Sequence, residues 1–209
     1  MKNYVQYGCG LSAPSEWNNY DVSPTLFLQK IPFINKLIKL NTRFPDNVIY
    51  GDIVKGLPLE ENSCDGLYCS HTLEHLSLND FRIALANSYK ILKPGGIFRC
   101  IIPDLEYAAR LYLKELDEGD RNASIKFIAS TTMLGVEQRS KGLKGIMVSV
   151  FGNAKHLWMW DSQSLSEELS KVGFKSIRNC SFNDSKDSMF SYVESEGRFN
   201  HAVAIECFK

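Results

Sequence analysis

The sequence predicts a largely parallel, doubly wound α/β sheet, built as a single domain over residues 1–209. Three observations predict it. The chain of 209 residues is 44% hydrophobic and 23% charged, strand-like runs alternate with amphipathic helical patterns, and Gly and Pro punctuate the chain without gathering into a linker. Ligands bind such sheets at the carboxyl ends of the strands, so the residues that follow each strand are the functional candidates.

Strands are predicted where short runs are rich in β-branched and aromatic residues. Helical patterns separate most of these runs, which favours parallel pairing between neighbouring strands. The runs are Val5 to Tyr7, Asn19 to Val22, Val48 to Tyr50, Gly66 to Cys69, Gly96 to Ile102, Lys175 to Cys180 and Ala202 to Cys207.

Helices are predicted where apolar residues recur at helical spacing. The first ends at Lys93-Pro94-Gly95-Gly96, which we interpret as the turn into the fifth strand. The last begins at a cap, Asp161 or Ser162, and ends at Gly173. The helices run from Asn79 to Leu92, from Leu105 to Leu116, and from the Asp161 or Ser162 cap through Val172.

Composition excludes several classes of protein. The chain has 24 Lys and Arg against 24 Asp and Glu, so no net field draws it onto nucleic acid. Its six cysteines lie mostly in apolar runs without a C-x-x-C pair, which indicates reduced, buried thiols. Residues 1–7 lack the apolar stretch of a signal peptide, and no apolar run approaches the roughly 20 residues that span a bilayer. We expect a cytoplasmic protein without stable membrane insertion.

Chemically useful residues follow each of the first four strands. In Gly8-Cys9-Gly10 the glycines let the backbone turn tightly and approach a ligand. Asp21 can accept hydrogen bonds from both hydroxyls of a ribose, and Asp52 lies where an adenine amino group could donate. Ser70-His71 ends the fourth run. A plain turn remains the alternative for the glycines and for Asp21, and a capping role for Asp52.

Together these residues resemble the class I S-adenosylmethionine (SAM)-dependent methyltransferases, in particular small bacterial methyltransferases of type 11 associated with surface-polysaccharide genes. The resemblance covers nearly the whole chain and implies a Rossmann-like, seven-stranded sheet. Further motifs that carry it are Trp17-Asn18-Asn19-Tyr20-Asp21, Leu57-Pro58, Cys64-Asp65, His71-Thr72-Leu73-Glu74-His75-Leu76, Ile102-Pro103-Asp104-Leu105, His156-Leu157-Trp158-Met159-Trp160-Asp161 and Val172-Gly173-Phe174.

The resemblance also assigns the cofactor SAM to particular residues. It implies that Gly8 and Gly10 pack against its methionine part and that Cys9, between them, belongs to the cofactor-binding residues. It further implies that Asp21 holds the ribose, that Asp52 and Ile53 meet the adenine, and that Ser70 lies beside the methionine part and His71 beside the acceptor.

The chain departs from the family pattern between the first two strands. The pattern leaves about twenty residues, filled by a helix, between the glycine loop and the ribose carboxylate. Here ten residues lie between Gly10 and Asp21. We therefore expect the helix to be replaced by a loop from Leu11 to Asn18, which shortens the sheet's first connection.

Catalysis requires alignment of the acceptor with the methyl donor and, for a hydroxyl acceptor, removal of a proton. His71 and His156 are the candidate bases because histidine titrates near neutral pH. We prefer His71 for its place at a strand end, while packing remains the alternative for each. Asp104 is a weaker acidic candidate that could also cap the helix that follows it.

His71-x-x-Glu74-His75 matches the H-x-x-E-H pattern of zinc peptidases, which need both histidines on a single helix. Here the pattern straddles a strand end and a helix start, so we reject a peptidase and assign no metal ligands. A divalent metal at this Glu-His cluster, as in some related methyltransferases that bind acceptor hydroxyls, stays open. For His75 we expect a structural hydrogen bond.

A basic stretch points to the acceptor. Residues 138–155 contain four basic residues, three glycines and no carboxylate, and they lead into His156. We predict an acceptor lid around residues 118–160 and an anionic small-molecule acceptor, such as a sugar nucleotide or sugar phosphate. A solvated loop is the alternative. The predicted substrate-binding residues are Arg139, Lys141, Lys144 and Lys155, with Trp158 and Trp160 as an aromatic wall unless they are core residues.

Residues 25–40 are apolar and cationic, and Pro32 interrupts them. We expect this segment to cover the SAM pocket or to form a homodimer contact, rather than to rest on a membrane. The sequence as a whole predicts a SAM-dependent O-methyltransferase in capsule or surface-polysaccharide biosynthesis. The alternatives are an inactive SAM-binding subunit and an NAD-dependent oxidoreductase, whose signature would need a third glycine.

Overall fold

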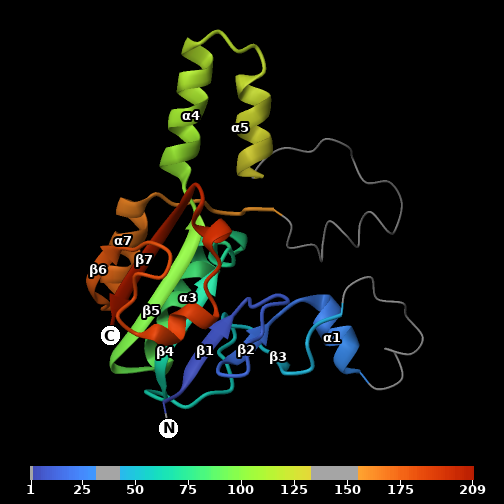
Figure 1. The fold of residues 1–209 in the computed structure, drawn as a ribbon, viewed down its shortest axis with the longest axis vertical. Coiled ribbons are helices and arrows are strands. Elements are labelled where there is room, and N and C mark those ends of the chain that lie inside the picture. The colour runs from blue at the N-terminus through green and yellow to red at the C-terminus, as the bar shows by residue number, and fades with distance from the viewer. Residues whose placement is uncertain (1, 32–42, 133–154) are drawn as a thin grey trace.

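The computed structural model describes residues 2–31, 43–132 and 155–209. Within these ranges seven strands form one sheet in the order β3-β2-β1-β4-β5-β7-β6 (Figure 1). Among them β7 alone runs antiparallel to its neighbours. The predicted seven-stranded, largely parallel sheet is confirmed. The strands are β1 (Tyr4–Tyr7), β2 (Asn18–Asp21), β3 (Val48–Tyr50), β4 (Cys64–Ser70), β5 (Leu92–Pro103), β6 (Lys175–Asn179) and β7 (Ala202–Phe208).

The predicted helices are confirmed with ends shifted by at most one residue. Asp161 caps the last of them, accepting a hydrogen bond from the Ser164 amide at 2.8 Å, and Gly173 ends it at φ 115°. The described helices are α1 (Pro24–Lys30), α3 (Leu78–Ile91), α4 (Leu105–Asp117), α5 (Ala123–Thr131) and α7 (Ser162–Val172), with 3-10 turns η1 (Leu73–His75), η2 (Ser188–Tyr192) and η3 (Glu196–Phe199).

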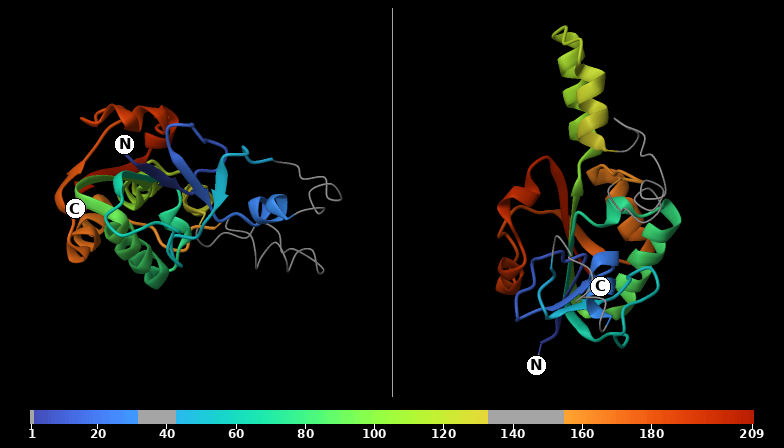
Figure 2. Two further views of the ribbon diagram at one scale, coloured as in Figure 1. Left: turned by 90° about the horizontal axis from the view of Figure 1, so that it is seen from below. Right: turned by 90° about the vertical axis from the view of Figure 1, so that its right-hand side faces the viewer.

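The two faces of the sheet are covered differently. Helices α3 and α7 pack on one face, and the segment with η2 and η3 lies over the other (Figure 2). Because side chains alternate along a strand, Phe98 and Cys100 of β5 enter the core beneath the helices, whereas Ile101 enters the second core.

A loop replaces the helix between β1 and β2, as predicted. Residues 8–17, all of them described, connect the two strands. Trp17 anchors this loop because its buried ring contacts Tyr4 and Phe190, and its indole N–H donates to the Met189 carbonyl at 3.0 Å.

The prediction for Lys93 to Gly96 needs correction. These residues do not precede the fifth strand but lie within β5 as a bulge: Leu92 pairs with Cys64 and Ile97 with Gly66, so four residues oppose Asp65. Lys93 supports the bulge by donating to the Asp65 carboxylate at 2.7 Å.

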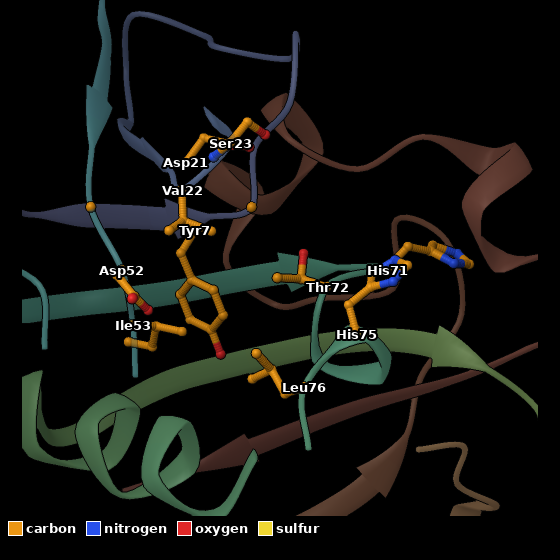
Figure 3. A pocket seen from close by; sticks show the side chains of 12 residues that line it. Tyr7, Asp21, Val22, Ser23, Asp52, Ile53, His71, Thr72, His75 and Leu76 are labelled. Atoms are coloured by element: carbon orange, nitrogen blue, oxygen red, sulfur yellow. The ribbon is translucent and has the colours of Figure 1, made fainter. Parts of the chain in front are cut away.

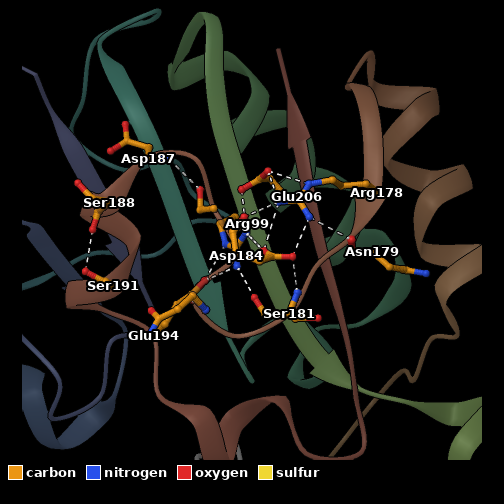
Figure 4. Close-up of polar contacts among 12 residues, drawn as sticks. Arg99, Arg178, Asn179, Ser181, Asp184, Asp187, Ser188, Ser191, Glu194 and Glu206 are labelled. Atoms are coloured by element: carbon orange, nitrogen blue, oxygen red, sulfur yellow. Dashed lines mark hydrogen bonds and ion pairs between the residues drawn. The ribbon is translucent and has the colours of Figure 1, made fainter.

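A buried ionic network fastens the C-terminal segment to the second face (Figure 4). Arg99 of β5 is fully buried and donates to Glu206 and Glu194 at 2.7 Å and to Asp184 at 3.0 Å. Arg178 also binds both Glu206 and Asp184. Three carboxylates thus share two guanidinium groups, which fixes the chain from Asp184 to Glu194 on the sheet.

Helices α4 and α5 form a hairpin that projects beyond the carboxyl ends of the strands (Figure 1). No residue of α4 is buried. Within the described ranges, no helix combines the length and apolarity that crossing a membrane would require. All six cysteines are free and five are buried, which confirms the expected reduced thiols.

Candidate functional site

The carboxyl ends of four neighbouring parallel strands, β3, β2, β1 and β4, meet at one pocket. Figure 3 shows Asp21 and Asp52 toward one end of this pocket and His71 and His75 at the other. The predicted residues at these strand ends are therefore brought together. The lining residues are Tyr7, Gly8, Asp21, Val22, Ser23, Gly51, Asp52, Ile53, His71, Thr72, His75 and Leu76.

The glycine loop after β1 has a conformation that disfavours side chains. Gly8 lies at φ 65°, and a Cβ there would stand 2.1 Å from Oγ1 of Thr72. Gly10 lies at φ 56° with open space around it. Between them, burial and the nearby Asp21 carboxylate raise the pKa of the Cys9 thiol to about 12, so this thiol is inert at neutral pH.

Asp21, at the end of β2, organises the backbone around the pocket. Its buried carboxylate accepts hydrogen bonds from the amide of Gly10 at 2.9 Å and from that of Ser23 at 2.8 Å. Each oxygen retains a second acceptor position. Asp21 can therefore hold the glycine loop in place and still accept from a diol.

Asp52 and Ile53 follow β3 on the same side. One Asp52 oxygen accepts the Val54 amide at 3.0 Å, and the other lies 3.7 Å from the Lys55 ammonium. The buried Ile53 side chain lies alongside. The pair offers an acceptor beside an apolar surface, which suits a heterocycle with an exocyclic amine.

His71 follows β4 in a left-handed conformation, φ 51°. Its Nε2 contacts the Arg198 carbonyl at 2.9 Å, and its Nδ1 lies 3.4 Å from Glu74. Burial lowers its pKa, but the Glu74 carboxylate and the Arg198 carbonyl outweigh burial and raise it overall. Because a carbonyl can only accept, Nε2 carries a hydrogen and Nδ1 has the lone pair of the neutral ring.

His156 lies outside this pocket, next to His75, with their ring centroids 5.2 Å apart. Its position is set by backbone bonds from Leu157 and Trp158 to the Glu74 carbonyl, at 2.8 and 3.2 Å. Burial lowers the pKa of His156. The two candidate bases therefore occupy different surroundings.

Sequence reasoning missed Arg198. It lines a second, smaller pocket on the other side of Gly8, together with Cys9 and Ser70, and its guanidinium donates to the Ser70 carbonyl at 3.4 Å. Nothing in the local sequence marks it, because it comes from η3, 127 residues beyond the histidine that its carbonyl binds.

The other predicted residues have varied positions. Arg139, Lys141 and Lys144 lie outside the described residues, and Lys155 is exposed. Trp160 is buried in the main core, stacked on Phe81 at 4.4 Å between centroids, which is the packing role left open as its alternative. Trp158 is 41% exposed. Asp104 accepts the Glu106 amide at 2.8 Å and caps α4.

Comparison with known proteins agrees with this architecture. Residues 5–100 match the model of a family described as a methyltransferase domain. No protein of curated function matches the sequence. A SAM-dependent methyltransferase from Thermotoga maritima, described as a possible histamine N-methyltransferase, superimposes with a TM-score of 0.52 and 20% identity over 100% of this chain and 83% of the other.

Two further solved structures are similar. A SAM-dependent methyltransferase from Archaeoglobus fulgidus has a TM-score of 0.50 and 15% identity, covering 100% of this chain and 86% of its own. One from Mesorhizobium loti has a TM-score of 0.50 and 14% identity, covering 99% and 90%. The sheet order and these similarities show that the chain has the class I methyltransferase fold.

Proposed function

We propose that this protein transfers a methyl group from SAM to a hydroxyl of a small anionic acceptor. The observation that carries the proposal is the polarity of the pocket, with two carboxylates toward one end and histidines at the other (Figure 3). A nucleoside fits the acidic end, since its ribose hydroxyls and adenine amine are donors. The reacting group then lies toward His71.

The geometry of the chain supports the cofactor contacts that we propose. Asp21 accepts the ribose hydroxyls, and Asp52 with Ile53 meets the adenine. Gly8 lines the pocket at φ 65°, where a backbone without a side chain can approach the methionine part. In the second pocket, Ser70 lies beside that part and the Arg198 guanidinium pairs with its carboxylate.

His71 is the base in this proposal, since it lines the cofactor pocket and His156 does not. SAM would supply a methyl group carried on a sulfonium. The acceptor oxygen would form a bond to the methyl carbon as the carbon–sulfur bond breaks, and the electron pair of the broken bond would stay on sulfur. His71 takes the hydroxyl proton at Nδ1, while Nε2–H stays fixed on the Arg198 carbonyl. The raised pKa of His71 suits this transfer near neutral pH.

The basic stretch of residues 138–155 supports an anionic acceptor, held by Arg139, Lys141, Lys144 and Lys155 beneath a lid around residues 118–160. A sugar nucleotide or sugar phosphate combines this charge with hydroxyl groups. Such an acceptor would place the enzyme in surface-polysaccharide biosynthesis, as the family resemblance indicates.

The test is turnover of SAM with a panel of sugar nucleotides and sugar phosphates, with N- and C-nucleophile acceptors alongside. Methylation of a phosphorylated sugar hydroxyl, at least tenfold slower in His71→Gln and unchanged in His201→Gln, supports the proposal. Transfer only to nitrogen or carbon would overturn the O-methyltransferase assignment. Tight SAM binding without turnover on any acceptor would favour a non-catalytic subunit.

A further inference from the structure

A buried carboxylate beside the pocket lacks the partners that its burial demands. Glu74 is 0% exposed, and neither of its side-chain oxygens accepts a hydrogen bond from the residues that the structure describes. An ionised carboxylate out of water costs several kcal/mol unless hydrogen bonds or a counter-charge compensate it. Its surroundings therefore decide what stabilises Glu74.

Three histidines lie near this carboxylate, and His71 Nδ1 is 3.4 Å from it. His75 Nδ1 contacts the Lys155 carbonyl at 3.0 Å and must carry the hydrogen, which leaves Nε2 as an acceptor 3.9 Å from Glu74. The Nδ1 of His156 is buried without a partner in the described ranges.

One ligand atom from each of Glu74, His75 and His156 lies within 4.8 Å of the other two. We propose that Glu74, His75 and His156 bind a divalent first-row transition metal ion. The bond between His75 Nδ1 and the Lys155 carbonyl fixes the orientation of that ring, as backbone partners commonly do at protein metal sites. Metal–ligand distances of about 2.0–2.2 Å would draw the three atoms closer by small side-chain movements.

The donor set selects the class of ion. Two imidazoles and one carboxylate suit Zn²⁺, Co²⁺ or Fe²⁺, whereas Mg²⁺ and Ca²⁺ prefer oxygen ligands throughout. The three protein ligands leave a coordination position for a further oxygen. The rejected peptidase pattern differs, because there Glu74 would be a base and His71 a ligand, whereas His71 follows β4 and shares no helix with His75.

The position of the site suggests its role. His75 is both a ligand here and a lining residue of the cofactor pocket, at the end opposite the carboxylates. A metal ion there would hold the acceptor's hydroxyl oxygen and lower its pKa. This role rests on the proposed function, whereas metal binding itself does not.

The test is calorimetric titration of chelator-treated, full-length protein with Zn²⁺, without SAM or acceptor. We expect one equivalent to bind, at least tenfold more weakly in Glu74→Gln, His75→Gln and His156→Gln, and unchanged in His201→Gln, which replaces a histidine outside the cluster. Mg²⁺ should give no binding. Far-UV circular dichroism and thermal unfolding like those of the wild type show that each variant is folded.

Absorption of the Co²⁺ complex separates this site from the six free cysteines. The proposal is supported if the Co²⁺ complex shows the absorption bands of an ion bound by nitrogen and oxygen, and if these bands are absent in His156→Gln. Thiolate-to-metal charge-transfer bands would overturn it. So would absence of binding, or wild-type affinity in Glu74→Gln. The experiment measures metal binding alone. If no metal binds, the proposed methyl transfer is not contradicted. If Zn²⁺ binds but the protein transfers no methyl group, the proposed metal site is not contradicted.

Discussion

At the residue scale, some residues of the pocket fix the backbone and others allow close packing. Asp21 holds the backbone of Gly10 and Ser23 while keeping acceptor capacity for a ligand, and Gly8 lets Thr72 approach. Asp21 and Asp52 were predictable because the first ends a strand and the second lies two residues beyond one. Arg198 and Thr72 were not, because their contribution depends on packing between segments distant in sequence.

Arg198 supplies a residue-scale prediction. Replacing it with Gln removes the charge beside Gly8 and Ser70, so affinity for S-adenosylhomocysteine should fall about tenfold, as for a lost charge-assisted hydrogen bond. Affinity for 5′-methylthioadenosine, which lacks the amino-acid carboxylate, should be unchanged. Calorimetry with both ligands measures this, and equal losses for the two would contradict the assignment.

At the scale of elements, local sequence defined the strands and helices well because caps, glycines and apolar spacing agree with the tertiary packing. The bulge in β5 was missed because it depends on a contact between strands. Leu92 pairs with Cys64, so the strand begins before the turn-forming residues Lys93 to Gly96 and includes them. The contact between α3 and α7 was also beyond local sequence. There Arg82 donates to both oxygens of Glu168, at 2.7 and 3.0 Å.

That contact predicts a pH dependence of stability. The hydrogen bond from Arg82, and then that from Lys171, lowers the pKa of Glu168 from 4.5 to about 2. A lowered folded-state pKa stabilises the protein above the unfolded value, and this stability is lost as pH falls from 4.5 toward 2. Glu168→Gln should therefore cost about 1–2 kcal/mol at pH 7, since Arg82 is half exposed.

Urea unfolding at neutral and acidic pH checks this prediction, with the exposed neighbour Glu167→Gln as the matched control. The difference between wild type and Glu168→Gln should shrink as the pH falls below 4.5. A difference that is constant across this range would mean that packing, and not the charge of Glu168, joins the two helices.

At the scale of the whole molecule, stability is expected to be uneven. The sheet is buried between two cores, while no residue of α4 is buried and the hairpin of α4 and α5 projects away from the sheet (Figure 1). Hydrogen exchange should therefore show amides of residues 107–130 opening at lower free energy than those of β4 and β5. Equal protection of the hairpin and the sheet would show that the hairpin is held by other contacts.

The long-range assembly of the second face could not be predicted, because Arg99 meets Asp184, Glu194 and Glu206 only once β5 and β7 are paired. The sheet and its strand-end residues, in contrast, followed from the order of motifs. Together these strand ends are proposed to bind SAM.

Calorimetric titration with S-adenosylhomocysteine of the wild type, Asp21→Ala, Asp52→Ala and the surface control Asp46→Ala tests this claim most directly. We predict tight, single-site binding by the wild type and Asp46→Ala. Affinity should fall at least tenfold for each pocket variant, since each loses hydrogen bonds to the nucleoside. Wild-type affinity in both pocket variants would contradict the account.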